Sequence, residues 1–275
     1  MTSSIDVRGT GDDAVAVRTW PAPPTPKANI LLVPGLGEHS GRYEHVGRYL
    51  SDAGFRVASL DLPGNGRSGG RRAYMESIDL FLDALELASG DFGNDLPFVL
   101  MGHSMGGLTS LTYTLADRPK PDLLVLSAPW LGDKLPEWQR RLVLVLGRFA
   151  PKLEIPNPID GSELSRDPAV GEAYDTDPHN YAKTTLQQGV AIYDAIDWAR
   201  ANYEQLSVPT YLLHGVDDPL VSPKYTAPLG ELDHVTRRLW PNLRHESLNE
   251  PEWEAVLGEV VDWLDDQLTR LSAQP

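Results

Sequence analysis

Short apolar runs alternate with longer segments of helical periodicity along most of the chain. Each run holds five or six residues with few polar interruptions, as in the segment NILLVP at residues 29–34. Strands that are buried on both faces have this composition, because helices cover both sides of a parallel sheet. The predicted strands are residues 29–34, 56–60, 97–101, 122–127 and 210–214, with a weaker sixth at 236–240.

The segments between these runs favour helices. In the clearest of them, apolar residues recur three and four positions apart, which places them on one face of a helix. The predicted helices are residues 42–53, 76–89, 105–116, 187–203 and 252–271. A regular alternation of strands and helices predicts an α/β fold with a doubly wound, mostly parallel sheet.

Residues 129–186 interrupt this alternation. They contain no strand-like run, and prolines stand at positions 136, 151, 156, 158, 168 and 178. A helical patch at 138–149 carries five consecutive apolar residues, which is more apolar surface than one buried helix face requires. The patch either packs on the main domain or offers apolar surface to a lipid-like ligand. We interpret residues 129–186 as a helical cap inserted into a core domain formed by residues 1–128 and 187–275.

Composition and charge narrow the classes of function. The chain of 275 residues has no cysteine, which excludes disulfides, thiolate metal sites and a cysteine nucleophile. Its net charge of −15, with scattered basic residues, would repel nucleic acid and disfavour anionic lipid headgroups. Residues 1–13 lack the features of a secretory signal, and no apolar run approaches the ~20 residues of a membrane-spanning helix. We therefore expect a soluble, cytoplasmic protein that acts on a small-molecule or lipid substrate.

The strongest local motif is Gly102-His103-Ser104-Met105-Gly106, which follows a predicted strand and precedes a predicted helix. This arrangement resembles the nucleophile elbow of the α/β hydrolases, in which the serine occupies a strained turn. Small residues two positions to either side let the neighbouring backbone approach, and the hydroxyl stands at the positive end of the following helix. The motif predicts Ser104 as a nucleophile.

A serine nucleophile needs a histidine to accept its proton and a carboxylate to hold that histidine in one tautomer. In the α/β hydrolases the acid and the histidine follow the serine in that order, at the ends of later strands. Asp217 and Asp218 follow the strand at 210–214, and the spacing and the succeeding proline favour Asp218. His245 follows the last predicted strand and is the predicted base.

The other six histidines are disfavoured as the base, either by their position in the predicted fold or by their order in the sequence relative to Ser104. His103 should point to the other side of the sharp turn, and His214 should be an ordinary buried histidine at a strand end. The remaining four lie before the serine, in the predicted cap or before the last strand: His39, His45, His179 and His234.

The developing oxyanion of such a reaction needs backbone donors. One should be the N–H of Met105, the residue after the nucleophile. The other should come from the loop after the first buried strand, where Gly35 and Gly37 flank Leu36. Because two glycines let this backbone come close to the serine, we expect the Leu36 N–H to be the second donor.

Several segments together resemble the monoacylglycerol lipase and lysophospholipase-like branch of the α/β hydrolases. They are Gly35 to Tyr43 (GLGEHSGRY), Asp61 to Gly70 (DLPGNGRSGG), Gly102 to Gly107 (GHSMGG) and, in the predicted cap, Ile159 to Arg166 and Tyr174 to Pro178. The resemblance implies hydrolysis of a single long acyl ester on a glycerol or similar headgroup, with no cofactor and no metal. It assigns the triad to Ser104, Asp218 and His245 and the oxyanion hole to Leu36 and Met105. It also places Glu38, Arg42 and Tyr174 at the polar end of the substrate pocket.

The chain departs from the family pattern at two positions near the site. Pro34 stands where the family usually has a histidine before the Gly-x-Gly loop, and Asn65 replaces a histidine in the loop after residue 61. The oxyanion donors are backbone groups, so the expected reaction class is unchanged. The alternatives that stay open are a lysophospholipase, a general short-chain carboxylesterase, an amide or peptide hydrolase with the same triad, and a non-catalytic α/β-hydrolase scaffold.

Overall fold

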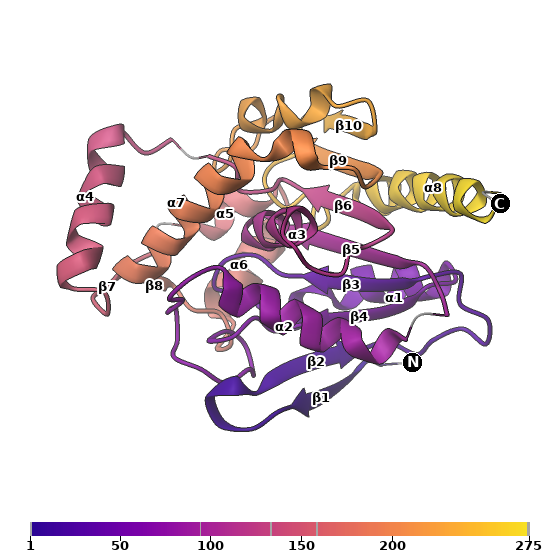
Figure 1. The fold of residues 1–275 in the computed structure, drawn as a ribbon, viewed down its shortest axis with the longest axis horizontal. Helices are drawn as coiled ribbons and strands as arrows, with labels where there is room; N and C mark the ends of the chain where they lie inside the picture. The colour runs from indigo at the N-terminus through magenta and orange to yellow at the C-terminus, as the bar shows by residue number, and fades with distance from the viewer. Residues whose placement is uncertain (1, 94, 133, 158, 274–275) are drawn as a thin grey trace.

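An eight-stranded sheet forms the centre of the molecule in the computed structural model, which describes residues 2–93, 95–132, 134–157 and 159–273 (Figure 1). The strands are ordered β1-β2-β4-β3-β5-β6-β9-β10. All neighbouring pairs from β4 to β10 are parallel, whereas β2 runs antiparallel to both β1 and β4. The strands are β1 (Ser4–Arg8), β2 (Val15–Thr19), β3 (Asn29–Val33), β4 (Arg56–Leu60), β5 (Phe98–His103), β6 (Leu123–Ser127), β9 (Thr210–Gly215) and β10 (Val235–Trp240).

The six predicted strands are confirmed as the six parallel strands of this sheet. The prediction of a mostly parallel α/β fold is therefore correct. The N-terminal hairpin of β1 and β2 was not located by the apolar pattern, because β1 is an edge strand whose side chains are largely exposed. β5 continues two residues beyond its predicted end, so that it leads directly into Ser104.

Alternate side chains of the central strands enter two hydrophobic cores, one on each face of the sheet. Leu31 packs in the core that α2, α3 and α7 cover, and Leu32 packs in the core that α1 and α8 cover. Both faces are thus apolar, which explains why the strands read as unbroken apolar runs. The helices are α1 (Glu44–Asp52), α2 (Asp79–Ser89), α3 (Met105–Leu115), α7 (Leu186–Ala201) and α8 (Trp253–Ser272), close to the predicted bounds.

Residues 129–186 form a separate set of elements beyond the sheet. Figure 1 shows α4 at the outer edge of the molecule, alongside α7. The prediction that this segment holds no strand is wrong, since Ile155 and Thr184 pair in a short antiparallel ladder. Its strands have three residues each, which is too short to show an alternating pattern. The elements are α4 (Glu137–Phe149), β7 (Glu154–Pro156), α5 (Gly161–Leu164), α6 (Pro168–Thr176) and β8 (Lys183–Thr185).

A helix that crosses a membrane must be both long and apolar. No helix in the described ranges meets both requirements.

Candidate active site

Ser104 occupies a strained turn between β5 and α3. Its φ of 52° and ψ of −116° lie in a region that non-glycine residues rarely adopt. Two glycines make this turn possible: a Cβ at Gly102 would lie 2.3 Å from the Gly106 carbonyl oxygen, and one at Gly106 would lie 2.1 Å from that of Val33. The turn holds the Ser104 hydroxyl at the carboxyl edge of the sheet, as the motif predicted.

The three predicted triad residues meet at this edge, each from the loop after a different strand. Nε2 of His245 lies 2.9 Å from Ser104 Oγ, and Nδ1 of His245 lies 2.7 Å from Asp218 Oδ2. All three side chains are buried. Asp217, the alternative acid, is exposed. The geometry is that of a relay in which one imidazole links a hydroxyl to a carboxylate.

Asp218 accepts four hydrogen bonds, two on each carboxylate oxygen. The backbone N–H groups of Leu220 and Val221 donate to Oδ1 over 2.8 and 2.9 Å. Oδ2 faces His245 and also Nε2 of His214 at 3.0 Å. Burial would raise the pKa of Asp218, but the neighbouring His245 and these donors outweigh it and hold the pKa well below the usual range. Asp218 is therefore ionised throughout the neutral range.

The pKa of His245 is set by two opposing effects. Burial favours the neutral ring, but the Asp218 carboxylate favours the imidazolium more strongly and raises the pKa above the ordinary 6.5. A base of this kind is neutral, and able to accept a proton, only in the alkaline part of its titration.

His103 lies beside the relay, contrary to the prediction that it points away. Its ring centroid is 4.8 Å from that of His245, and its Nδ1 is 3.2 Å from Ser127 Oγ. Burial, together with the neighbouring His245, lowers the pKa of His103 to about 4. The turn at Ser104 changes the direction of the chain, but the residue before it is still on β5 and faces the loop that carries His245.

The loop after β3 lies against the nucleophile. A Cβ at Gly35 would be 3.3 Å from Ser104 Cβ. Within the described part of the chain, the backbone N–H groups of Leu36 and Met105 have no hydrogen-bond partner. An oxyanion hole needs donors that are free to bind the substrate, and the assignment of Leu36 and Met105 to it remains a prediction.

Glu38 and Arg42 belong to a buried ionic cluster behind this loop. One oxygen of Glu38 accepts from the Gly35 N–H and from the Tyr43 hydroxyl, and the other lies 2.5 Å from Arg42. Arg42 also pairs with both oxygens of Glu246, at 2.5 and 2.8 Å. Burial would raise the pKa of Glu246, but Arg42 lowers it to about 2. Glu246 was not singled out from the sequence, although its place next to His245 is a signal that could have identified it.

Tyr174 covers this cluster from α6. The guanidinium of Arg42 lies 4.9 Å from the centre of its ring. The polar groups of Glu38 and Arg42 are thus engaged with other protein groups in this structure, which favours a role in holding the loop. A direct contact of Glu38, Arg42 or Tyr174 with substrate remains a prediction.

The second half of the predicted cap is hydrogen-bonded to the loop after β3 and to the loop that carries Glu246. The Tyr181 N–H donates to the Gly37 carbonyl over 2.8 Å, and Nε2 of His39 lies 2.9 Å from Asp177 Oδ2. The Leu164 carbonyl accepts from the Glu246 N–H over 2.8 Å. Residues 159–182 therefore contact the loops that carry Gly37 and Glu246, whereas α4 packs alongside α7.

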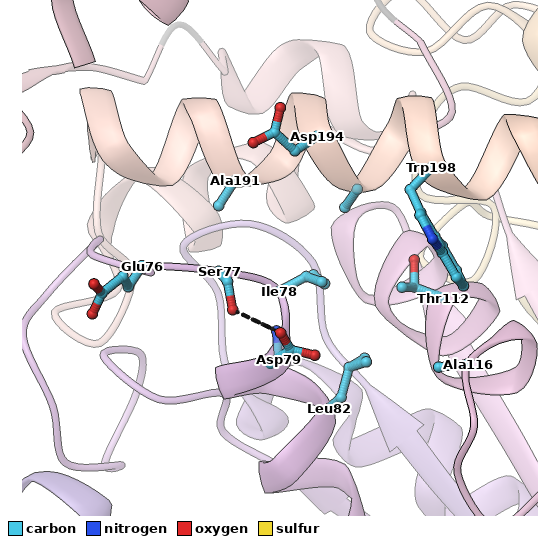
Figure 2. Close-up of a pocket in the computed structure, with 11 residues that line it drawn as sticks. Glu76, Ser77, Ile78, Asp79, Leu82, Thr112, Ala116, Ala191, Asp194 and Trp198 are labelled. Carbon is cyan, nitrogen blue, oxygen red and sulfur yellow. Dashed lines mark hydrogen bonds between the residues drawn. The ribbon is translucent and has the colours of Figure 1, made fainter. Parts of the chain in front are cut away.

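A cavity of about 400 Å³ lies elsewhere, between α2, α3 and α7 (Figure 2). Its lining includes Leu82, Thr112 and Trp198, and none of the triad residues. The relay, and not this cavity, is therefore the candidate for chemistry. Nowhere in the described ranges do three or more His, Asp or Glu side chains come together as a metal site would require.

The sequence and the structure are similar to those of known proteins. Residues 24–252 match the family described as serine aminopeptidase, S33, and include Ser104, Asp218 and His245. A monoacylglycerol lipase of Mycolicibacterium smegmatis is 30% identical over 94% of this chain and 96% of its own length. An uncharacterised abhydrolase domain-containing protein of Dictyostelium discoideum is 31% identical over 98% of this chain, which spans only 30% of that longer protein. The crystal structure of a Paleococcus ferrophilus monoacylglycerol lipase matches with a TM-score of 0.83 and 30% identity, covering 97% of this chain and 100% of that one.

Proposed function

The chain belongs to the serine aminopeptidase S33 family, in the monoacylglycerol lipase-like branch of the α/β hydrolases, and we propose that it cleaves monoacylglycerol-like lipid esters through an acyl-enzyme. The observation that carries this proposal is the relay from Ser104 through His245 to Asp218, with two unpaired backbone donors beside the serine. In it Ser104 is the nucleophile, His245 the general base and acid, and Asp218 the group that orients His245.

The geometry supports a two-step reaction. Ser104 Oγ attacks the ester carbonyl carbon while its proton passes to Nε2 of His245, and the N–H groups of Leu36 and Met105 stabilise the resulting oxyanion. The tetrahedral intermediate collapses when His245 returns that proton to the departing alkoxide, which leaves as an alcohol such as glycerol. Water then attacks the acyl-Ser104 ester, giving its proton to His245, and collapse releases the fatty acid and restores the Ser104 hydroxyl.

The substrate class rests on likeness to two proteins named monoacylglycerol lipases, each about 30% identical to this chain along nearly all of its length. Lysophospholipids and short-chain esters are the alternatives within the same chemistry. The family description names an aminopeptidase, so an amide substrate is a further alternative.

We further propose that residues 129–186 act as a cap and that α4 touches lipid surfaces transiently. Seven large apolar side chains between residues 135 and 153 are exposed, with Trp138 at 63% and Phe149 at 82%. Five of them lie on α4, mostly three or four positions apart, and one more flanks each end of the helix: Leu135, Trp138, Leu142, Val145, Leu146, Phe149 and Leu153. A contiguous exposed apolar stripe of this kind marks a surface that binds another apolar surface.

The charge around this stripe differs from that of the whole chain. Between residues 134 and 152, five basic residues stand against the single acidic residue Glu137: Lys134, Arg140, Arg141, Arg148 and Lys152. Arg140 is paired with Asp197, which leaves a locally basic rim in a chain whose net charge is −15. The whole-chain charge therefore does not decide how this face meets anionic headgroups, because screening confines charge effects to about 10 Å.

The substrate class is tested by comparing kcat/KM for monoacylglycerols of increasing chain length with that for short aryl esters, a lysophospholipid and an aminoacyl anilide. We expect long monoacylglycerols to give the highest values and Ser104→Ala to abolish turnover. A higher kcat/KM for the aryl ester, the lysophospholipid or the anilide would contradict the proposed substrate class and favour the class of that compound. No turnover of any of them by the folded wild-type protein would favour a non-catalytic scaffold.

A further inference from the structure

His214 is the last residue before Gly215 at the end of β9, and its side chain is completely buried. Its Nε2 lies 3.0 Å from Asp218 Oδ2 and 2.8 Å from the carbonyl oxygen of Val221. Two histidines therefore converge on one oxygen of the acid, because Nδ1 of His245 lies 2.7 Å from the same Oδ2.

The surroundings of His214 determine which of its nitrogens carries the hydrogen. Asp218 is ionised and the Val221 carbonyl can only accept, so Nε2 must be a donor that both oxygens share. On the other side of the ring, Nδ1 lies 3.4 Å from the Thr226 hydroxyl, which donates to the Pro223 carbonyl over 2.9 Å. The ring is thus held in one orientation with its Nε2–H aimed at Oδ2.

We propose that His214 is a positioning residue of the triad, which acts through Asp218 by fixing Oδ2 and sharing its negative charge. This inference rests on the proposed function, because it assigns His214 to the same relay. A donor on Oδ2 makes that oxygen a weaker acceptor toward His245. Without the donor, the whole charge of Oδ2 would act on His245, and the carboxylate would keep only three of the four hydrogen bonds that position it.

Several charged groups surround His245, and Arg42 lies against two of them, Glu38 and Glu246. Asp218, Glu246 and Glu38 favour its protonated form, and its ring faces that of His103, which is neutral above pH 4. His214 is 0% exposed, and its hydrogen bond to the relay is the one to Asp218. A change at His214 can therefore reach His245 through that carboxylate without altering the surface that meets substrate.

The test compares His214→Gln with His214→Leu. The glutamine amide nitrogen stands the same number of bonds from Cα as Nε2, so it keeps a donor at Oδ2, whereas leucine removes it. His45→Leu is the matched control, because His45 also bonds to a backbone carbonyl, that of Leu248 at 2.8 Å, but does not contact the triad. If the leucine variant does not fold, His214→Asn replaces it, since its shorter amide does not reach Oδ2.

The pH dependence of kcat/KM for the best ester is measured for each folded variant. We expect the leucine variant to lose about 10-fold in kcat with KM little changed, and its acid limb to move about half a pH unit or more to higher pH. The glutamine variant should restore both quantities, and His45→Leu should match the wild type. Equal impairment of the glutamine and leucine variants, or a folded leucine variant with an unchanged kcat and acid limb, would overturn the proposal.

A second measurement does not depend on turnover. The pKa of His245 is followed by NMR titration of its ring resonances in the wild type and in the same variants. We expect this pKa to rise in the leucine variant and to return in the glutamine variant, and an unchanged pKa would contradict the proposal even if no substrate were found. Failure of the proposed function would instead appear as a wild-type protein that turns over no ester.

Discussion

The site is organised around individual carboxylates that collect several donors. Asp218 takes four hydrogen bonds, and in the proposed mechanism it holds His245 in the tautomer and orientation that a Ser104 nucleophile needs. Glu38 does the same for the loop after β3, where it accepts from the Gly35 N–H and ties the loop to Arg42. Asp218 thus orients the side chain of His245, and Glu38 orients the backbone of the loop after β3.

Asp218 and Asp217 give a matched pair of variants. We expect Asp218→Asn to lower kcat by about 10⁴-fold, because the amide no longer fixes the His245 tautomer. Asp217→Asn removes an exposed carboxylate one residue away and should leave kcat within about two-fold. Steady-state kinetics of both variants check this, and comparable losses in the two would contradict the assignment of Asp218.

His103 predicts a pH dependence of stability. Burial lowers its pKa in the folded state to about 4 from an ordinary 6.5, so between these values the unfolded chain binds more protons. The contribution of His103 to the free energy of unfolding is fully present above pH 6.5 and is lost as the pH falls to 4. The largest possible loss is on the order of 3 kcal/mol. His245, whose pKa is raised, acts in the opposite sense, and its contribution is lost above pH 6.5. The free energy of unfolding, measured with urea at several pH values between 4 and 6.5, should rise less steeply with pH for His103→Asn than for the wild type. An equally steep rise in both proteins would show that His103 is not the group responsible.

At the scale of elements, the positions of the strand ends explain why the candidate site residues lie close together. Ser104, Asp218 and His245 follow β5, β9 and β10, and the loop with Leu36 follows β3. Because these strands are parallel, their carboxyl ends lie at one edge and bring together residues far apart in the sequence. The close approach of β3, β5 and α3 is what leaves no room for a side chain at Gly106.

Gly106→Ala tests this close approach. Its Cβ would lie 2.1 Å from the Val33 carbonyl oxygen and 2.3 Å from that of Pro34, and both are backbone atoms that cannot give way alone. We expect a loss of about 3 kcal/mol or more in the free energy of unfolding, together with loss of activity from the displaced oxyanion loop. Gly90→Ala is the control, because a Cβ there meets nothing within 4 Å. If Gly106→Ala were as stable and active as that control, the packing described here would be wrong.

The exposed face of α4 makes a separate prediction about lipid surfaces. Trp138→Glu combined with Phe149→Glu should weaken flotation with all vesicles by about 10-fold or more, because two large apolar groups are lost. Arg141→Glu combined with Arg148→Glu should weaken binding to vesicles with anionic lipid and leave neutral vesicles unaffected. Leu87→Glu on α2 is the control for adding charge at an exposed apolar position. Wild-type flotation by the α4 variants would exclude this helix as the contact.

For the molecule as a whole, the sequence predicted those features that repeat along the chain or follow a short motif. The parallel strands and the helices over them were found because both faces of the sheet are apolar. The elbow and the order of Ser104, Asp218 and His245 followed from one motif and the positions of later strand ends. What escaped prediction depends on exposure, length or tertiary contacts. β1 is an exposed edge strand, and β7 and β8 are short. The packing of His103 on His245 and the pairing of Glu246 with Arg42 join residues that are far apart in the sequence, and the hydrogen bond from His214 to Asp218 depends on how the turn after β9 folds back.

The proposed chemistry depends on one claim, that Ser104 is an activated nucleophile. The most direct measurement treats the folded protein with a fluorophosphonate and locates the modified residue by peptide mass spectrometry. We expect one phosphonyl group per chain on the peptide that contains Ser104, no labelling of Ser104→Ala, and much slower labelling of His245→Ala. An unlabelled wild-type protein, or a label on another residue that persists in Ser104→Ala, would contradict the account.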